Sequence, residues 1–194
     1  MDFQVVEKGI SFDIKDKEGN AFTNLYIGAG WDTDEGKDVD LDLVGACLSG
    51  GRLTAQTRLI YFGDRDEPGI LLSEDNTTGE GEGDDESMTI DLTQVEADVD
   101  SIAVGLVAYS GADLSSAKNV HFRICNGRDE NAPQVFDVTV NQAQEGDTVL
   151  YAATLKRGAN GWEIENISQF HKLGGGSAAI KGFADLFTGQ TMAA

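Results

Sequence analysis

The sequence is short of basic residues. It carries 14 Lys and Arg against 34 Asp and Glu, a formal net charge of −20 over 194 residues. Nucleic-acid binding needs clustered Lys and Arg to neutralise phosphates, so the composition argues against that function. A bare anionic membrane surface is disfavoured for the same reason.

Proline, cysteine and long apolar runs are also scarce. The two cysteines, Cys47 and Cys125, each lie within an apolar run with no CxxC pair. Both are therefore predicted to be buried, reduced thiols. No apolar run is long enough to cross a bilayer, and the N-terminus has no basic region followed by an apolar stretch. These absences predict a cytoplasmic protein without membrane insertion.

The residues that are present favour a folded chain. Although the charge is high, 40% of the residues are hydrophobic, so the composition does not indicate disorder. A length of 194 residues is close to that of one domain. We therefore expect residues 1–194 to form a single domain.

Short segments rich in β-branched and aromatic residues recur between Gly, Asn and Asp. They occupy 25–30, 43–49, 57–62, 88–92, 102–109, 120–125, 135–140, 149–156 and 162–170. This pattern predicts an all-β-dominated chain that forms an antiparallel β-sandwich. Gly50-Gly51 and Asn160-Gly161 tolerate positive φ and are predicted to form turns between strands.

Helical signals are few. Thr93 followed by Glu96 fits a capping box that opens a short turn over residues 93–99. Near the C-terminus, four apolar residues recur at the spacing of one helix face: Ile180, Phe183, Ala184 and Phe187. They predict an amphipathic helix that docks on the sandwich.

Negative charge is concentrated in one region. The 52 positions between Arg65 and Lys118 contain 14 Asp and Glu and no basic residue, and residues 74–86 alone hold seven carboxylates. Two carboxylates about 5 Å apart repel by about 3 kcal/mol at an effective dielectric constant of 20. A folded loop therefore needs a cation, and the alternative is a solvated, disordered acidic loop.

The glycines in this segment favour calcium. Gly79, Gly81 and Gly83 permit tight turns that direct backbone carbonyls inward, and Ca²⁺ takes six to eight oxygen ligands. Zinc and softer metals are disfavoured because neither Cys nor His lies nearby, and Mg²⁺ retains more water. We expect one or two calcium ions.

A second acidic cluster lies at residues 32–42. From residue 38 onward acidic and apolar residues alternate, so a strand would place the aspartates on one face. These aspartates are Asp38, Asp40 and Asp42, and the apolar residues are Val39, Leu41 and Leu43. Such a face requires cations or is simply exposed to water. The EF-hand pattern fails at two places in this cluster, because Gly36 and Lys37 follow Asp34 where a third ligand and the glycine belong, and Leu43 follows Asp42 where the glycine belongs.

An enzyme is not expected. His121 and His171 have no nucleophile in a recognisable elbow beside them, and carboxylates interleaved with Gly79, Gly81 and Gly83 would repel a phosphate. Carboxylates that hold calcium stay ionised, which removes the raised pKa that acid–base chemistry needs. The alternative is a metal-dependent hydrolase or metal-handling enzyme that uses the acidic cluster with Mg²⁺ or a transition metal.

Three segments together resemble the TerD family of tellurium-resistance and general stress proteins. They are Gly28-Ala29-Gly30-Trp31-Asp32, residues 39–42 and residues 75–86. The resemblance extends over roughly residues 8–187. It implies a small bacterial β-sandwich protein that binds calcium and is linked to resistance against tellurite, phage and other stress.

The resemblance also implies a set of ligands. Carried over by position, these are Asp75, Asn76, Asp84, Asp85 and Glu86, joined by Asp32, Asp40 and Asp42, with Gly79, Gly81 and Gly83 acting through the backbone. The implied function is that of a calcium-dependent binding or scaffold module. The implied partners are other proteins of the tellurium-resistance system, either paralogues or a membrane protein.

Overall fold

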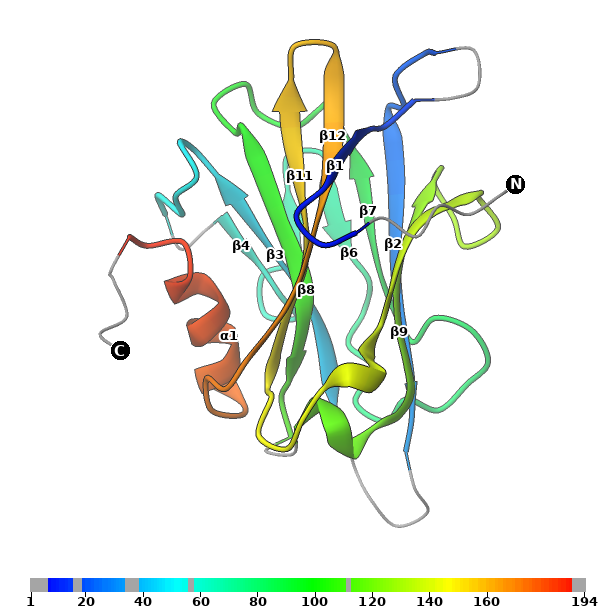
Figure 1. The fold of residues 1–194 in the computed structure, drawn as a ribbon, viewed down its shortest axis with the longest axis vertical. Helices are drawn as coiled ribbons and strands as arrows, with labels where there is room; N and C mark the ends of the chain where they lie inside the picture. Colours follow the sequence, from blue (N-terminus) through cyan, green and yellow to red (C-terminus); the bar gives the residue numbers. More distant parts are fainter. Residues whose placement is uncertain (1–6, 16–18, 34–38, 56–57, 111–112, 190–194) are drawn as a thin grey trace.

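The computed structural model describes residues 7–15, 19–33, 39–55, 58–110 and 113–189. Within these residues, two six-stranded sheets lie face to face (Figure 1). The first sheet has the order β1 (Ser11–Asp13), β12 (Gly161–His171), β11 (Val149–Gly158), β8 (Ser101–Ala108), β3 (Leu41–Leu48) and β4 (Leu59–Ile60). The second has the order β10 (Gln134–Thr139), β9 (Lys118–Asn126), β2 (Asn24–Asp32), β7 (Glu86–Asp91), β6 (Ile70–Leu72) and β5 (Asp66–Glu67).

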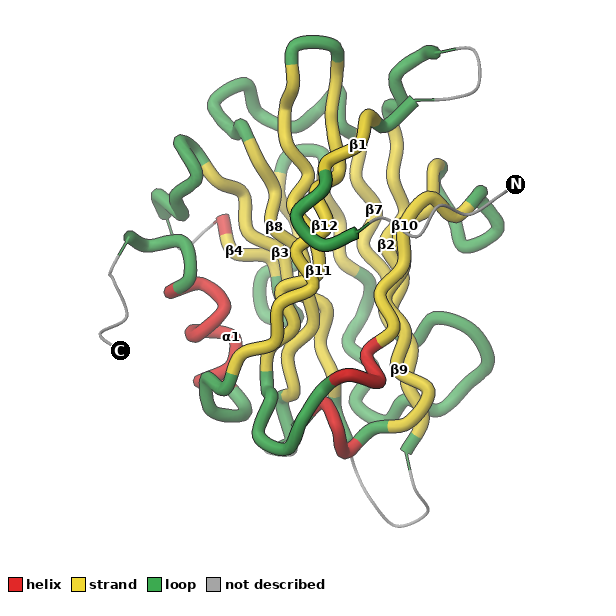
Figure 2. Tube along the Cα trace, in the orientation of Figure 1, coloured by secondary structure: helices red, strands yellow, loops and turns green. Residues whose placement is uncertain are grey.

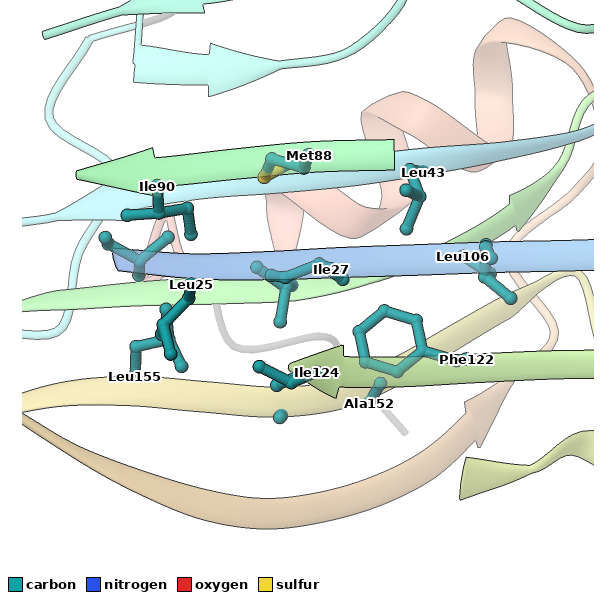
Figure 3. Packing of buried hydrophobic residues seen from close by; sticks show 14 of the residues in the cluster. Leu25, Ile27, Leu43, Met88, Ile90, Leu106, Phe122, Ile124, Ala152 and Leu155 are labelled. Atoms are coloured by element: carbon teal, nitrogen blue, oxygen red, sulfur yellow. The ribbon is translucent and has the colours of Figure 1, made fainter. Parts of the chain in front are cut away.

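All pairings between neighbouring strands are antiparallel, as predicted. Apolar side chains from both sheets fill the space between them. Figure 3 labels ten of these residues: Leu25, Ile27, Leu43, Met88, Ile90, Leu106, Phe122, Ile124, Ala152 and Leu155. Because alternate side chains of a strand point to opposite faces, β2 contributes every second residue to this core: Leu25, Ile27, Ala29 and Trp31.

Each of the nine predicted segments overlaps a strand of the structure, namely β2, β3, β4 and β7 to β12, with bounds that differ by up to two residues. Residue 57, at the start of the segment that contains β4, lies outside the described residues. The strands β1, β5 and β6 were not predicted. They have only two or three residues each, which is too short for a periodic pattern to show.

The turn predicted at Gly50-Gly51 is confirmed. Both glycines have positive φ, +61° and +69°, and they lie between the bridged residues Ser49 and Arg52. Positive φ at both central residues is the requirement of a type I′ turn, which glycine meets without strain.

The hairpin predicted near Asn160 is also confirmed, with the turn one residue earlier. Gly158 pairs with Gly161 at the end of the β11–β12 ladder, so Ala159 and Asn160 are the two turn residues. Gly161, with φ of +126°, is the first residue of β12.

The capping box predicted at Thr93 is wrong. Residues 92–98 form turns without a helix, and the Thr93 hydroxyl donates to Asp91 Oδ1 at 2.6 Å. The Glu96 carboxylate pairs with Arg58 at 2.8 Å. Both side chains are thus engaged outside a capping box. The short helical turns lie elsewhere, at η2 (Leu114–Ser116) and η3 (Val140–Gln142), close to each other near the start of β9 (Figure 2).

The C-terminal helix α1 (Ser177–Asp185) packs on the outer face of the first sheet, as predicted (Figure 1). Ile180, Phe183 and Ala184 are buried, and Phe187 is buried just beyond the helix end. They form one hydrophobic cluster with Val44, Val107 and Val149, which are outward-facing residues of β3, β8 and β11. Among the described residues, no helix has the length and hydropathy needed to span a membrane.

Candidate metal centre

The start of β3 and the loop between β6 and β7 form the acidic region of the structure. That loop, residues 73–85, bulges outward beside β2 and β9 (Figure 1). Its base is closed by Ser73 and Ser87: the Ser73 amide donates to the Ser87 carbonyl at 2.7 Å, and the Ser87 amide donates to Ser73 Oγ at 3.0 Å. The seven carboxylates of residues 74–86 therefore belong to a closed loop.

The predicted alternation at the start of β3 is confirmed for the residues described. The apolar members Val39, Leu41 and Leu43 belong to the core between the sheets. Asp40 is only 8% exposed and Asp42 is 0% exposed, so this face is not exposed to water. Asp38 lies outside the described residues.

Asp40, Asp42 and Asp75 bring their carboxylates together. One oxygen from each lies within 4.8 Å of the other two. Neither carboxylate oxygen of Asp42 has a hydrogen-bond partner among the described residues, nor has Asp40 Oδ1. A buried charge without a partner is costly, so this arrangement demands either protons or a cation.

Glu86, the first residue of β7, joins this cluster to both sheets. It is 2% exposed, and its Oε2 accepts a hydrogen bond from the Leu43 amide of β3 at 2.7 Å. Its Oε1 accepts from the Asn76 amide of the loop at 3.3 Å. One carboxylate thus ties the second sheet to the first sheet and to the acidic loop.

The ionisation of these carboxylates reflects their burial. Burial first, then the negative charges of Asp40 and Asp75, raise the pKa of Asp42 to about 8. Burial and the charge of Asp75 raise the pKa of Asp40 to about 6. Burial, opposed in part by the Leu43 amide and aided by Asp42, raises the pKa of Glu86 to about 8. All three shifts follow from burial and from neighbouring carboxylates, with no opposing positive charge among their causes in the described part of the chain.

Trp31 organises the loop against β2. Its indole Nε1 donates to the Val39 carbonyl at 2.9 Å, and its backbone amide donates to Asp85 Oδ2 at 2.8 Å. Gly79 packs on the indole so closely that a Cβ there would lie 2.4 Å from Nε1, and its φ is +62°. Trp31 was quoted in the sequence motif, but no pattern in the sequence indicated this role.

Asn76 and Asp85 brace the loop internally. Asn76 Oδ1 accepts from the amides of Thr78 and Gly79, both at 3.0 Å, and Asn76 Nδ2 donates to Asp85 Oδ1 at 3.2 Å. Burial raises the pKa of Asp85, opposed by the Trp31 amide. Both residues therefore support the loop next to Asp75.

Asp84 lies apart from the three clustered aspartates, on the outer face of the second sheet. It accepts hydrogen bonds from His121 at 2.8 Å, from Arg123 at 2.6 Å and from Tyr26 at 2.9 Å. Burial would raise the pKa of Asp84, but these hydrogen bonds outweigh it and hold that pKa well below its usual range. Its oxygens are thus occupied by protein donors rather than directed at the cluster.

Three other predicted site residues also lie outside the cluster. Asp32 is exposed and accepts a hydrogen bond from Asn119. Gly81 and Gly83 are exposed, with φ of +149° and +100°. The Gly83 carbonyl oxygen lies against Gly30 of β2, only 2.6 Å from where a Cβ of Gly30 would be.

Sequence reasoning missed the basic residues that hold Asp84. His121 and Arg123 are two apart on β9, so they share one face of that strand, while Phe122 between them enters the core. The signal available was this alternation, with a basic pair facing outward on a strand of a very acidic chain.

The clustered carboxylates fit a hard divalent cation. Asp40, Asp42 and Asp75 offer oxygen ligands only, and the Asp42 oxygen in the group is unpartnered among the described residues. Calcium coordinates carboxylate and carbonyl oxygens and tolerates irregular geometry. Glu86 and Asn76 lie next to the cluster and could add oxygens to it.

An antiparallel β-sandwich with buried carboxylates where β3 meets a glycine-rich acidic loop defines the class of this protein. A family model described as the TerD domain matches residues 3–179. The chain therefore belongs to the TerD domain family.

Individual relatives agree with this assignment. The chain is 27% identical over 184 residues to stress response protein SCP2 of Bacillus subtilis (strain 168), covering 84% of this chain and 90% of that protein. It is 26% identical over 173 residues to tellurium resistance protein TerD of Serratia marcescens, covering 84% and 88%. A crystal structure described as a homologue of telluride resistance protein (TerD) from Streptomyces coelicolor A3(2) superposes with a TM-score of 0.68 at 19% identity, covering 84% of this chain and 98% of that one. This last likeness concerns the fold alone.

Proposed function

We propose that this protein binds calcium at the Asp40–Asp42–Asp75 cluster and acts in stress response or tellurium resistance as a calcium-dependent binding or scaffold module. The observation that carries the proposal is the Asp42 carboxylate, which is fully buried with both oxygens unpartnered. A side chain in this state is stable as an anion only beside a positive charge.

The ligands would come from two separate parts of the sandwich. Asp42 belongs to β3 in the first sheet and Asp40 immediately precedes that strand, whereas Asp75 belongs to the loop that leads into β7 of the second. Bound calcium would supply the positive charge that offsets the repulsion among these carboxylates. Glu86 already connects the same two parts through the Leu43 and Asn76 amides. Ion binding would therefore stabilise the loop against the sandwich.

A binding role is favoured over catalysis. The clustered ligands are carboxylates alone, and the group contains no His, Cys or Lys that would act as base or nucleophile. Carboxylates that hold a cation stay ionised and do not serve as general acids. We therefore propose a calcium-dependent surface for protein partners rather than a metal-dependent hydrolase.

The proposed partners and location follow from the family. Relatives are named for tellurium resistance and for stress response. We propose that the ordered loop is recognised by other proteins of the tellurium-resistance system, either paralogues or a membrane protein. We propose a cytoplasmic location, in keeping with Cys47 and Cys125, which are both free and buried.

Titration calorimetry of the chelator-treated protein with calcium and with magnesium tests the proposal. Wild type is expected to bind calcium and to prefer it over magnesium, and Asp42→Asn is expected to weaken calcium binding more than about tenfold. Glu80→Gln is the matched control, because it removes one charge from the same loop at an exposed position. Absence of calcium binding by wild type would refute the proposal, and equal losses in both variants would indicate diffuse attraction rather than a site.

A further inference from the structure

Three side chains converge on Asp84 from the outer face of the second sheet. Arg123 Nη2 lies 2.6 Å from Asp84 Oδ2 and Arg123 Nε lies 3.0 Å from Oδ1. His121 Nε2 is 2.8 Å from Oδ1, and the Tyr26 hydroxyl donates to Oδ2 at 2.9 Å. The Asp84 side chain is 1% exposed, whereas that of Arg123 is 23% exposed. We call these four residues the Asp84 clasp.

Two glycines of β2 make room for the clasp. A Cβ at Gly28 would lie 2.1 Å from Asp84 Oδ2, and a Cβ at Gly30 would lie 2.6 Å from the Gly83 carbonyl oxygen. No real Cβ approaches an oxygen this closely. Gly28 and Gly30 therefore form a slot on the sheet surface that receives residues 83 and 84. Glycine is needed at these two positions because there is no room for a side chain, and not because of an unusual φ.

The clasp fixes the residues that follow it. The Asp85 amide donates to the Ala29 carbonyl at 2.8 Å, which continues the attachment to β2. The Asp85 and Glu86 carboxylates then accept hydrogen bonds from the Asn76 side chain and the Asn76 amide. Asn76 is the immediate neighbour of Asp75, so these contacts run from Asp84 to a member of the carboxylate cluster.

We propose that the Asp84 clasp positions the acidic loop, so that Arg123, His121 and Tyr26 hold Asp75 opposite Asp40 and Asp42 without contributing a ligand. This inference rests on the proposed function. It gives Asp84 a role different from that of the clustered aspartates: its charge is neutralised by the protein, and its task is to anchor the end of the loop.

Asp84 is either an anchor of the loop or a calcium ligand, and these two interpretations predict opposite changes in calcium affinity when Arg123 is replaced. If the clasp positions the loop, Arg123→Gln lets the loop move and weakens calcium binding. If Asp84 were itself a ligand, losing a competing guanidinium would free its carboxylate and strengthen calcium binding. The sign of the change therefore separates a positioning residue from a masked ligand.

The experiment is calcium titration calorimetry on the full chain, with melting temperature measured in chelator. Arg123→Gln and Gly28→Ala are each expected to raise the calcium dissociation constant about tenfold, the scale on which residues that orient ligands act. Arg157→Gln is the matched control. Arg157 donates to the Val99 carbonyl and lies over the Trp162 ring at 4.5 Å, away from the acidic loop. This control is expected to lower the melting temperature while keeping the wild-type dissociation constant.

An unchanged or lower dissociation constant in Arg123→Gln would overturn the inference while leaving the calcium site in place. Failure of wild type to bind calcium would overturn the proposed function and this inference with it. If Arg123→Gln does not fold, Tyr26→Phe removes one donor and keeps the ring. It should still weaken calcium binding, and an unaltered affinity there would overturn the inference as well.

Discussion

Two buried aspartates of this acidic region differ in their partners. The Asp84 side chain is 1% exposed and accepts hydrogen bonds from Arg123, His121 and Tyr26, whereas Asp42 is 0% exposed and neither of its oxygens has a partner among the described residues. The hydrogen bonds at Asp84 outweigh its burial and lower its pKa, while burial and neighbouring carboxylates raise the pKa of Asp42 to about 8. Both carboxylates are buried, so the difference lies in their partners. The charge of Asp84 is neutralised by protein donors, whereas that of Asp42 requires a cation.

The largest expected effect is on the free energy of unfolding when Asp84 loses its Arg123 partner. Arg123→Met keeps a long side chain but leaves a buried carboxylate without its guanidinium, and breaking a buried pair in this way costs about 3 kcal/mol. Urea unfolding in chelator should show this loss. Arg128→Met is the control, since Arg128 is 73% exposed and lies 3.7 Å from Asp91. Such a surface pair contributes at most about 1 kcal/mol. Equal losses in the two variants would contradict the contrast.

Calcium should supply at Asp42 the positive charge that Arg123 supplies at Asp84. A ligand that binds only the folded state stabilises it by about 2.7 kcal/mol at a hundred times its dissociation constant. For a chain of this size, that raises the melting temperature by roughly 5–10 °C. Calorimetric scans in excess calcium and in chelator measure the difference, with Asp42→Asn as the variant that should lose most of it. Identical melting temperatures in both conditions would rule out the cation site.

Without calcium, neutralising Asp42 should stabilise the protein, opposite in sign to the loss of Arg123. Burial first, then the charges of Asp40 and Asp75, make the Asp42 carboxylate costly to ionise. Asp42→Asn removes this cost, so the metal-free protein should gain on the order of 1 kcal/mol. Asp40→Asn should act in the same direction. Unfolding in chelator checks both, with Glu80→Gln as a control for net charge. A destabilised Asp42→Asn would mean that its oxygens are satisfied in a way that the structure does not show.

The sequence predicted the sandwich because its strands are long enough for alternation and turn residues to be recognised. β2, β3, β8, β9, β11 and β12 each have eight or more residues, and each was found. β5 and β6 have two and three residues, too few to leave a local pattern; β6 pairs with β7, and β5 pairs with β6. Thr93 misled because a capping pattern does not reveal that Asp91 takes its hydroxyl.

The candidate site was predictable as a region but not as a set of ligands. Alternation at β3 correctly placed Asp40 and Asp42 on one face, because strand geometry is local. Within residues 74–86, the sequence predicts both Asp75 and Asp84 as metal ligands and does not distinguish between them. Only the fold shows that Asp84 meets Arg123, which is 39 residues away in the chain and lies on β9, separated from β7 by β2 in the same sheet. Long-range pairing of this kind has no signal in a single sequence.

The smallest expected effect is a pH dependence confined to the metal-free protein. Asp42 and Glu86 have pKa values raised to about 8 in the folded state, above the ordinary values of about 4 in the unfolded chain. Their stabilising contribution is therefore complete below about pH 4 and is lost as the pH rises through about 8. Between pH 8 and 9, over the last part of a loss that begins above about pH 4, the melting temperature in chelator should fall by a few degrees. Asp84, with a lowered pKa, stays ionised throughout and adds no slope. Burial lowers the pKa of His171, so the protonation of that residue affects stability only at lower pH.

Excess calcium or Asp42→Asn should reduce the dependence of melting temperature on pH. Calcium holds the carboxylates ionised, and the substitution removes one of them. A slope that is the same in chelator, in calcium and in the variant would show that these carboxylates do not titrate as a buried, uncompensated group.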